Sequence, residues 1–265
     1  MSAVYQQKLS EQTMTRILNR TIVLTIALIT SILPAFSADF VDYSPAKRML
    51  EVDVHAIAGT SSVIQNYKSK FPQIQNLNVN MGGSFGVGFR AVFGLREYLG
   101  FGTALDVTLN NYNIDMAVLG TDRASMSAIF IDNQYYYANI PVFMSFRFNV
   151  AESVRWSVDA GFYYAYGFAG TQKQRIYRAE INAMDELVPQ LENVKTDYFH
   201  SRESFINGFN RGDIGLHLAT FMNFGPHLVV GVQYQIGIKN ASRATGIINP
   251  SIHNQYFHGT VGYRF

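Results

Sequence analysis

Residues 83–95 read GSFGVGFRAVFGL, in which apolar residues alternate with small or polar ones. Successive side chains of a β-strand point to opposite faces, so this alternation predicts a strand whose two faces meet different surroundings. The apolar face comprises Phe85, Val87, Phe89, Ala91 and Phe93, and the opposite face Ser84, Gly86, Gly88 and Arg90.

The same period of two recurs along the chain from about residue 49 to its end. Together with residues 83–95, it predicts eight strands. They are Met49–Gly59, Gly83–Leu95, Leu99–Asn110, Tyr135–Asn149, Arg155–Gly170, Gly212–Phe224, His227–Ile238 and Gln255–Phe265. Pro141 cannot donate a ladder hydrogen bond, so we expect a bulge or irregular pairing at that position.

The connections between these strands alternate between long and short. In order they are Thr60–Gly82, Arg96–Tyr98, Asn111–Gln134, Val150–Val154, Thr171–Arg211, Gly225–Pro226 and Lys239–Asn254. An even number of strands with short turns at one end and long loops at the other is typical of transmembrane β-barrels. The sequence therefore predicts an all-β, eight-stranded, antiparallel up-and-down transmembrane barrel with long extracellular loops.

Composition indicates which face of the strands meets lipid. Charged residues are 15% of the chain, against about 25% in a soluble domain, and the mean hydropathy is +0.02. The apolar faces carry no charge, as hydrocarbon requires, whereas the polar faces are rich in glycine, which suits a narrow lumen. A soluble barrel with an apolar cavity is the alternative. The net charge of +2 and the absence of a basic tract argue against nucleic-acid binding.

The first 37 residues resemble a secretory signal peptide. Lys8, Arg16 and Arg20 precede an apolar run, Thr21–Leu33, that is too short to span a bilayer, and an A-x-S site follows it. We expect cleavage before Ala38, which leaves residues 38–265 as the barrel domain and places it in the bacterial outer membrane.

The chain ends on an alternating strand whose last residue is aromatic. Phe257, Val261, Tyr263 and Phe265 share one face, a pattern that is similar to the C-terminal assembly signal of outer-membrane barrels. Four segments carry a further resemblance: residues 135–142 (YYYANIPV), 210–215 (NRGDIG), 234–240 (YQIGIKN) and 262–265 (GYRF). Over about residues 50–265 the chain resembles the PorT-like outer-membrane barrels of the Bacteroidota, a porin family of small, OmpX-like barrels.

The polar faces of the strands place charged side chains inside the predicted lumen. We expect a polar network there, and strand direction puts most of its members in the periplasmic half. The predicted members are Glu51, Asp53, Arg90, Asp106, Arg147, Arg155, Asp159, Asp213, His217 and Arg264. Arginine can bridge carboxylates with two parallel hydrogen bonds, so such a network would fill and lock the lumen. A charged permeation path is the alternative.

No catalytic, metal or cofactor site is predicted. His55, His217 and His258 face inward together with Ser84 and Ser157, but their spacing matches no known triad. The chain has no cysteine, which excludes disulfides and thiolate metal sites.

The loops are the expected site of function, because a rigid scaffold commonly presents binding residues on loops. In the third long loop, apolar residues of Gln174–Val194 recur near helical spacing and predict a short amphipathic helix. A hairpin that extends the neighbouring strands is the alternative. Aromatic loop residues could contact a ligand or pack the loops together: Tyr67, Phe71, Tyr112, Tyr177, Tyr198 and Phe199.

The sequence thus predicts a non-enzymatic outer-membrane barrel that acts as a membrane scaffold or as an interaction or adhesion surface. The alternatives are a narrow transporter or accessory barrel of a secretion system, and then an outer-membrane enzyme. The expected partners are outer-membrane lipid, the barrel-assembly machinery, and an extracellular or secretion-system protein.

Overall fold

The computed structural model describes residues 40–120, 125–181, 187–200, 208–243 and 250–265. The predicted signal peptide lies outside them. Within these ranges no helix is long and apolar enough to cross a membrane. The elements are β1 Leu50–Gln65, α2 Tyr67–Lys70, β2 Ile74–Arg96, β3 Leu99–Leu119, β4 Met126–Ala151, β5 Val154–Ile181, β6 Leu187–Asp197, β7 Gly212–Phe224, β8 Leu228–Gly237 and β9 Ile252–Arg264.

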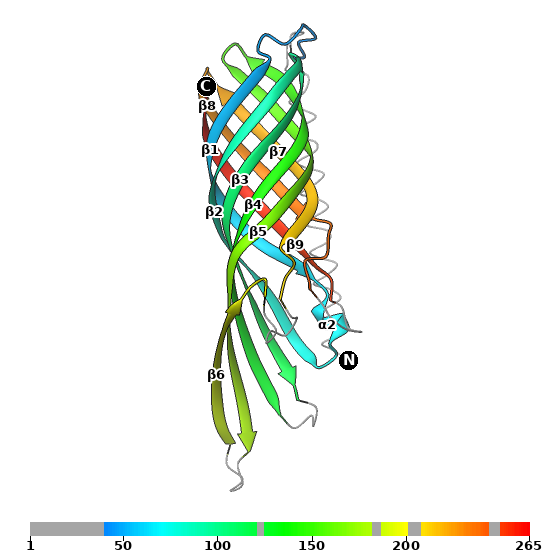
Figure 1. The fold of residues 1–265 in the computed structure, drawn as a ribbon, viewed down its shortest axis with the longest axis vertical. Coiled ribbons are helices and arrows are strands. Elements are labelled where there is room, and N and C mark those ends of the chain that lie inside the picture. Colours follow the sequence, from blue (N-terminus) through cyan, green and yellow to red (C-terminus); the bar gives the residue numbers. More distant parts are fainter. Residues whose placement is uncertain (1–39, 121–124, 182–186, 201–207, 244–249) are drawn as a thin grey trace, which may run out of the picture. The chain divides into compact units, whose positions relative to one another are not determined.

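Eight of the described strands form a closed antiparallel ring (Figure 1). Neighbours in the ring follow the chain from β1 to β5 and continue with β7, β8 and β9. The ring closes where β1 pairs with β9, from Asp53↔Arg264 to Gln65↔Ile252. The predicted eight-stranded up-and-down barrel is confirmed.

Several strands are longer than the alternation predicts, and the excess lies at the long-loop end. β5 has 28 residues and β4 has 26, whereas β8 has 10. Beyond the ring, the ends of β2, β3, β4 and β5 stay paired and continue as an open sheet, which Figure 1 shows below the barrel. We call this part, with β6, the extracellular sheet, because long loops of such barrels face the cell exterior.

The helix predicted over Gln174–Val194 is wrong. The described part of that segment is a hairpin in which β5 pairs with β6 from Thr171↔Asp197 to Ile181↔Leu187. The ladder between β4 and β5 also extends to Ser127↔Arg178. An extended β5 therefore has hydrogen-bonding partners on both sides, which a short helix above the barrel would lack.

Pro141 interrupts one ladder without a bulge. On β3, Thr103 pairs with Val142, and the next pair is Asp106↔Asn139 in the same register. The gap follows from the missing N–H of proline. The Thr103 hydroxyl donates to the Pro141 carbonyl at 2.9 Å and keeps the strands together there. Irregular pairing is therefore confirmed.

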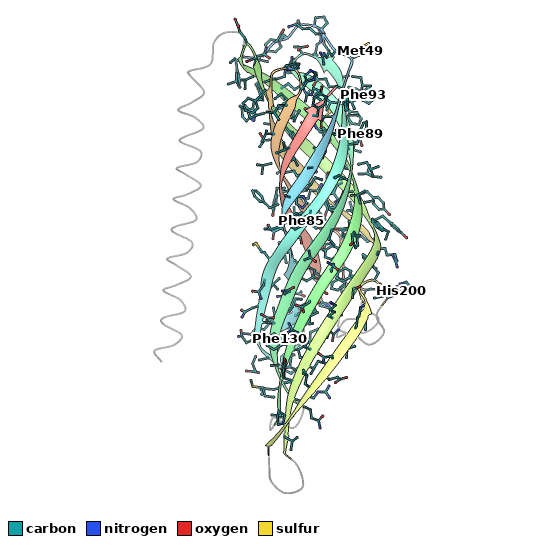
Figure 2. All side chains as sticks on the ribbon, turned by 90° about the vertical axis from the view of Figure 1, so that its left-hand side faces the viewer. Met49, Phe85, Phe89, Phe93, Phe130 and His200 are labelled. Carbon is teal, nitrogen blue, oxygen red and sulfur yellow. The ribbon has the colours of Figure 1, made fainter. Side chains whose placement is uncertain are left out.

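The apolar face of every strand in the ring points outward, as predicted. In Figure 2, Phe85, Phe89 and Phe93 lie along the outside of β2, and their side chains are about half exposed. Val54, Leu105, Ile140, Phe162, Leu216, Val232 and Phe257 continue this exposed belt around the ring. A belt of this kind is expected to face lipid.

The lumen is crowded enough to require glycine. A Cβ atom on Gly88 would collide with the Asp106 carboxylate and the His55 ring, and one on Gly167 would collide with the Phe199 ring. The glycines on the inner faces therefore make room for larger side chains of neighbouring strands.

Candidate functional site

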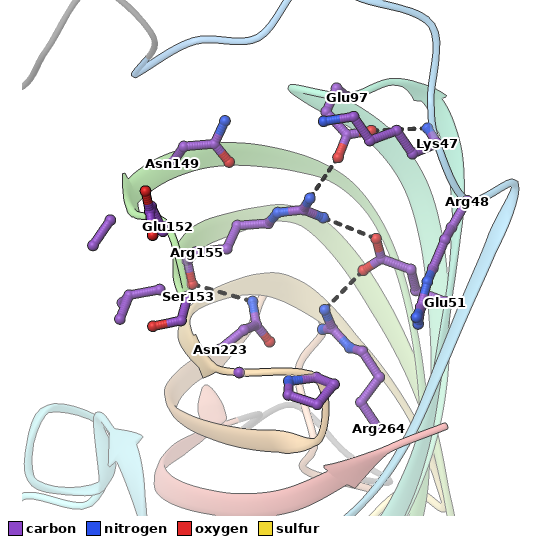
Figure 3. A pocket seen from close by; sticks show the side chains of 14 residues that line it. Lys47, Arg48, Glu51, Glu97, Asn149, Glu152, Ser153, Arg155, Asn223 and Arg264 are labelled. Carbon is purple, nitrogen blue, oxygen red and sulfur yellow. Dashed lines mark hydrogen bonds and ion pairs between the residues drawn. The ribbon is translucent and has the colours of Figure 1, made fainter.

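The charged side chains at the periplasmic end of the lumen converge on one carboxylate. Glu51 of β1 accepts hydrogen bonds from Arg147 of β4 at 3.0 Å, Arg155 of β5 at 3.1 Å and Arg264 of β9 at 2.9 Å (Figure 3 shows the last two). Glu51 is buried. Three cations on one buried carboxylate tie four of the eight ring strands together across the barrel.

A second layer lies deeper and is organised by Arg90. Its guanidinium donates to Asp159 at 2.6 and 3.0 Å and to Asp53 at 3.1 Å. It also lies 4.5 Å from the ring centroid of Phe221, on which it can make a cation–π contact. All of these polar groups are buried, and each charge has an opposite partner, as low-dielectric surroundings require.

The remaining predicted members lie further along the lumen. Asp106 contacts His55 at 3.0 Å, and His55 contacts Asp53 at 3.5 Å, so Asp106 joins the network through a histidine. Asp213 instead accepts from Tyr163 and Asn254. His217 contacts the Gln235 amide at 3.1 Å. Neither Asp213 nor His217 is hydrogen-bonded to an arginine among the described residues, so the structure brings together eight of the ten predicted residues.

Glu97 belongs to this network, but the sequence pattern did not predict it. It lies in the short turn between β2 and β3, where there is no alternation to assign a face. Its carboxylate pairs with Arg155 and accepts the backbone N–H of Lys47 at 2.9 Å. The short connection at the barrel mouth was the one signal that could have found it.

The buried Ser84–His258 contact lacks the geometry of an activated nucleophile. The Ser84 hydroxyl donates to Asn110 at 2.7 Å, so its 2.8 Å contact with His258 Nε2 requires the imidazole to donate. The Gln233 amide approaches His258 Nδ1 at 3.5 Å, which fits that tautomer. A general base would need the opposite arrangement.

Aromatic side chains fill the extracellular half of the lumen. Tyr198 stacks on Tyr135 at 4.6 Å and on Phe209 at 4.1 Å between ring centroids, and its hydroxyl lies 3.1 Å from that of Tyr112. Burial raises the pKa of Tyr198 well above its usual range, so its hydroxyl keeps its proton. Tyr67, Tyr112, Tyr198 and Phe199 are buried, which shows that they pack the loops together. We call this group, with Tyr135 and Phe209, the aromatic plug.

The extracellular sheet ends in an unpaired edge. Among the described residues, β6 pairs only with β5. Leu191 of β6 is 55% exposed and lies opposite the exposed Tyr177 of β5. Tyr177 packs edge-on against Phe130 of β4. This half of the molecule thus presents backbone hydrogen-bonding groups beside apolar side chains.

A concave pocket of about 430 Å³ opens at the periplasmic mouth (Figure 3). Its floor is the outer layer of the charged network, and its rim is formed by the turns after β4 and β7 and by the segment before β1. It is lined by Lys47, Arg48, Glu51, Glu97, Asn149, Ala151, Glu152, Ser153, Val154, Arg155, Asn223, Gly225, Pro226 and Arg264.

The predicted C-terminal signal lies on the outer face of β9. The side chains of Phe257, Val261, Tyr263 and Phe265 are all exposed toward the lipid side. β9 pairs with β1 and β8, so this strand completes the ring.

The chain is similar to several known proteins. Three solved structures are similar: Ail, the attachment invasion locus protein of Yersinia pestis (11% identity, TM-score 0.36), OprG from Pseudomonas aeruginosa (10%, 0.42) and Neisserial surface protein A (12%, 0.36). The matches cover 82%, 84% and 81% of this chain and 100%, 99% and 97% of those chains. No curated protein matches. The family model of the outer membrane protein beta-barrel domain matches residues 45–243, and the chain therefore belongs to this family of bacterial outer-membrane barrels.

Proposed function

We propose that the protein is a non-enzymatic outer-membrane barrel that presents the β6 edge of its extracellular sheet to a protein partner. The single observation that carries this proposal is an 11-residue strand that, within the described part of the chain, pairs on one side only. An unpaired edge can accept an extended segment of another protein, whose backbone then adds one strand to the sheet.

Pro189 indicates which β6 residues point their backbone groups outward. Proline has no N–H, so within a sheet its nitrogen faces the unpaired side of an edge strand. Backbone direction repeats every second residue, so Leu191, Asn193 and Lys195 direct their N–H and C=O groups to the free edge as well. Residues of the other parity, such as Val194, direct theirs toward β5, on which Val194 lies opposite Gln174.

The packed lumen supports a scaffold role for the barrel. The charged network and the aromatic plug occupy opposite halves of the lumen with buried side chains. Such packing holds the extracellular sheet on a rigid base, as binding sites require. The narrow transporter remains the alternative function. Stable conductance of the purified protein in planar bilayers, comparable to that of a general porin, would favour it and contradict the scaffold.

The proposal includes the remaining partners. The exposed belt contacts outer-membrane lipid. The barrel-assembly machinery recognises the outward-facing aromatic residues of β9. The docking partner is an extracellular or secretion-system protein. Residues 135–142 and 210–215 support placement among the PorT-like barrels of the Bacteroidota.

Strand addition is tested by one substitution on the free edge. Outer-membrane vesicles that carry the full chain are incubated with an array of ten-residue extended peptides. Asn193→Pro removes an outward N–H and is expected to abolish peptide capture. Asn193→Ala keeps the backbone donor and is expected to retain it. Equal capture by both variants, or no capture above that of empty vesicles, would show that β6 is not a docking edge.

A further inference from the structure

The pocket at the periplasmic mouth lies at the opposite end of the barrel from the extracellular sheet. Its volume of about 430 Å³ falls within the usual range of small-molecule sites, about 300–1,000 Å³. Several separate parts of the chain contribute to it: the segment before β1 with the start of β1, the turns after β2, β4 and β7, and the end of β9. The closed ring holds these parts at a fixed spacing.

Positive charge exceeds negative charge in this pocket. Four cationic side chains and three carboxylates line it. The cations are Lys47, Arg48, Arg155 and Arg264, and the carboxylates are Glu51, Glu97 and Glu152. The Arg155 side chain is 27% exposed although it pairs with Glu51 and Glu97. A guanidinium can donate five hydrogen bonds, so Arg155 keeps donors for a ligand.

Two buried polar atoms beside the pocket lack partners among the described residues. One is the amide oxygen of Asn223, whose amide nitrogen donates to the Arg155 carbonyl, and the other is Nε of Arg264. Both side chains are more than nine-tenths buried. Buried polar groups are normally paired, so the wall that Asn223 and Arg264 form beside the pocket is polar and not fully satisfied.

The charges are also separated across the pocket. Figure 3 shows Glu152 on one side together with Asn149 and Ser153, and Lys47 and Arg48 on the other. The guanidinium groups of Arg155 and Arg264 lie between the two sides, where both pair with Glu51. An occupant that fits this arrangement carries a negative group toward the arginines and a positive group toward Glu152.

We propose that the periplasmic mouth binds a small zwitterion of the amino-acid class, either a free amino acid or a whole dipeptide. Its carboxylate lies against Arg155 and Arg264, where arginine can bind it with two parallel hydrogen bonds. Its ammonium group lies against Glu152.

Three probes that share a methyl group test this assignment on the purified full chain in detergent micelles. Alanine carries both charges, propionate carries only the carboxylate, and ethylamine carries only the ammonium group. Saturation-transfer NMR reads the methyl signal of each. We expect alanine to bind, propionate to bind about two- to fivefold more weakly because one exposed ion pair is lost, and ethylamine not to bind. Equal binding of all three probes, or of none, overturns the proposal.

Substitutions locate the site. Glu152→Gln, on an exposed turn, is expected to weaken alanine to the level of propionate without changing propionate. Arg155→Lys is expected to weaken both carboxylates by at least about tenfold, since the planar fork is lost. Arg96→Gln removes an exposed charge from the same end outside the pocket and is the matched control. Loss of binding in the control, or no change in Glu152→Gln, contradicts the assignment.

Two further readings complete the experiment. Each variant must migrate faster unheated than boiled on a denaturing gel, which shows that the barrel is folded. If Arg155→Lys does not fold, the binding result of Glu152→Gln still tests the proposal. Alanyl-alanine distinguishes the two sources of ligand: binding at least as tight as that of alanine indicates a dipeptide, and weaker binding indicates a free amino acid. Propionate binding as tight as alanine identifies a simple anion site and overturns the zwitterion.

Discussion

Glu51 shows what a single residue can do inside a narrow barrel. It accepts hydrogen bonds from three arginines, on β4, β5 and β9, all of which are far from Glu51 in the sequence. Removing its charge takes away the carboxylate that pairs with Arg147, whereas Arg155 keeps Glu97 and Arg264 keeps a longer contact with Asp53 at 3.8 Å. A buried guanidinium group without a counter-charge is costly in surroundings that exclude water.

The first prediction is that Glu51→Gln lowers the free energy of unfolding by about 3–5 kcal/mol. Glu192→Gln is the matched control, because Glu192 pairs with Arg178 at 3.4 Å on the exposed face of the hairpin, and such pairs contribute about 0–1 kcal/mol. Urea titration in lipid vesicles, followed by the heat-dependent gel shift, measures both. Equal losses in the two variants would mean that burial does not set the strength of these pairs.

At the residue scale, much of the candidate site follows from the sequence, for a simple reason. The face of a residue depends only on its parity within a strand, so Arg90 and Arg264 could be assigned to the lumen without knowing the ring. Contacts across the lumen cannot be predicted from the alternation alone. Arg90 of β2 meets Asp159 of β5, which is not a neighbouring strand, and this depends on the strand tilt. Asp213 and His217 face the lumen, as their positions in the alternation predict, but they lie too far along the barrel axis to join the arginines.

At the scale of elements, the ring and the hairpin differ in how far sequence determines them. The bounds of β7 were predicted correctly, because glycine and turn residues flank it and both faces alternate cleanly. β6 was missed because apolar residues of Gln174–Val194 happen to recur at helical spacing. What holds the hairpin extended is the ladder to β4, a non-local partner that a window of sequence does not contain.

The second prediction concerns this hairpin. Joining Gln174 to Val194, which lie opposite each other on β5 and β6, by a two-residue Asn-Gly turn removes most of β6. The ring does not include β6, so we expect normal membrane insertion and an unchanged heat-dependent gel shift, together with loss of peptide capture. Failure of the shortened chain to fold would instead make the hairpin part of the barrel's stability.

At the scale of the whole molecule, the lumen is closed by layers that come from different parts of the chain. The Arg90 layer is built from residues of the ring strands, whereas the aromatic plug includes Tyr198, Phe199 and Phe209 from the long connection between β6 and β7. The two layers consist of different residues, so either one is expected to keep the lumen closed.

The third prediction follows from this double closure. Tyr198→Ala thins the aromatic plug, and Arg90→Ala combined with Asp159→Ala removes a buried pair from the charged layer. Neither variant is expected to show stable conductance in planar bilayers, because the untouched layer still blocks the path. Conductance in only one of them would identify that layer as the sole barrier.

The unequal strand lengths have a consequence for life on a crowded cell surface. A strand of about 9–11 residues suffices to cross the bilayer, yet β5 has 28 residues, or about 90 Å of extended chain. Its surplus raises the β6 edge tens of ångströms above the lipid headgroups. The docking edge would therefore stand clear of short surface sugars and be masked by long ones. Polysaccharide chain length would then set when this protein can be reached.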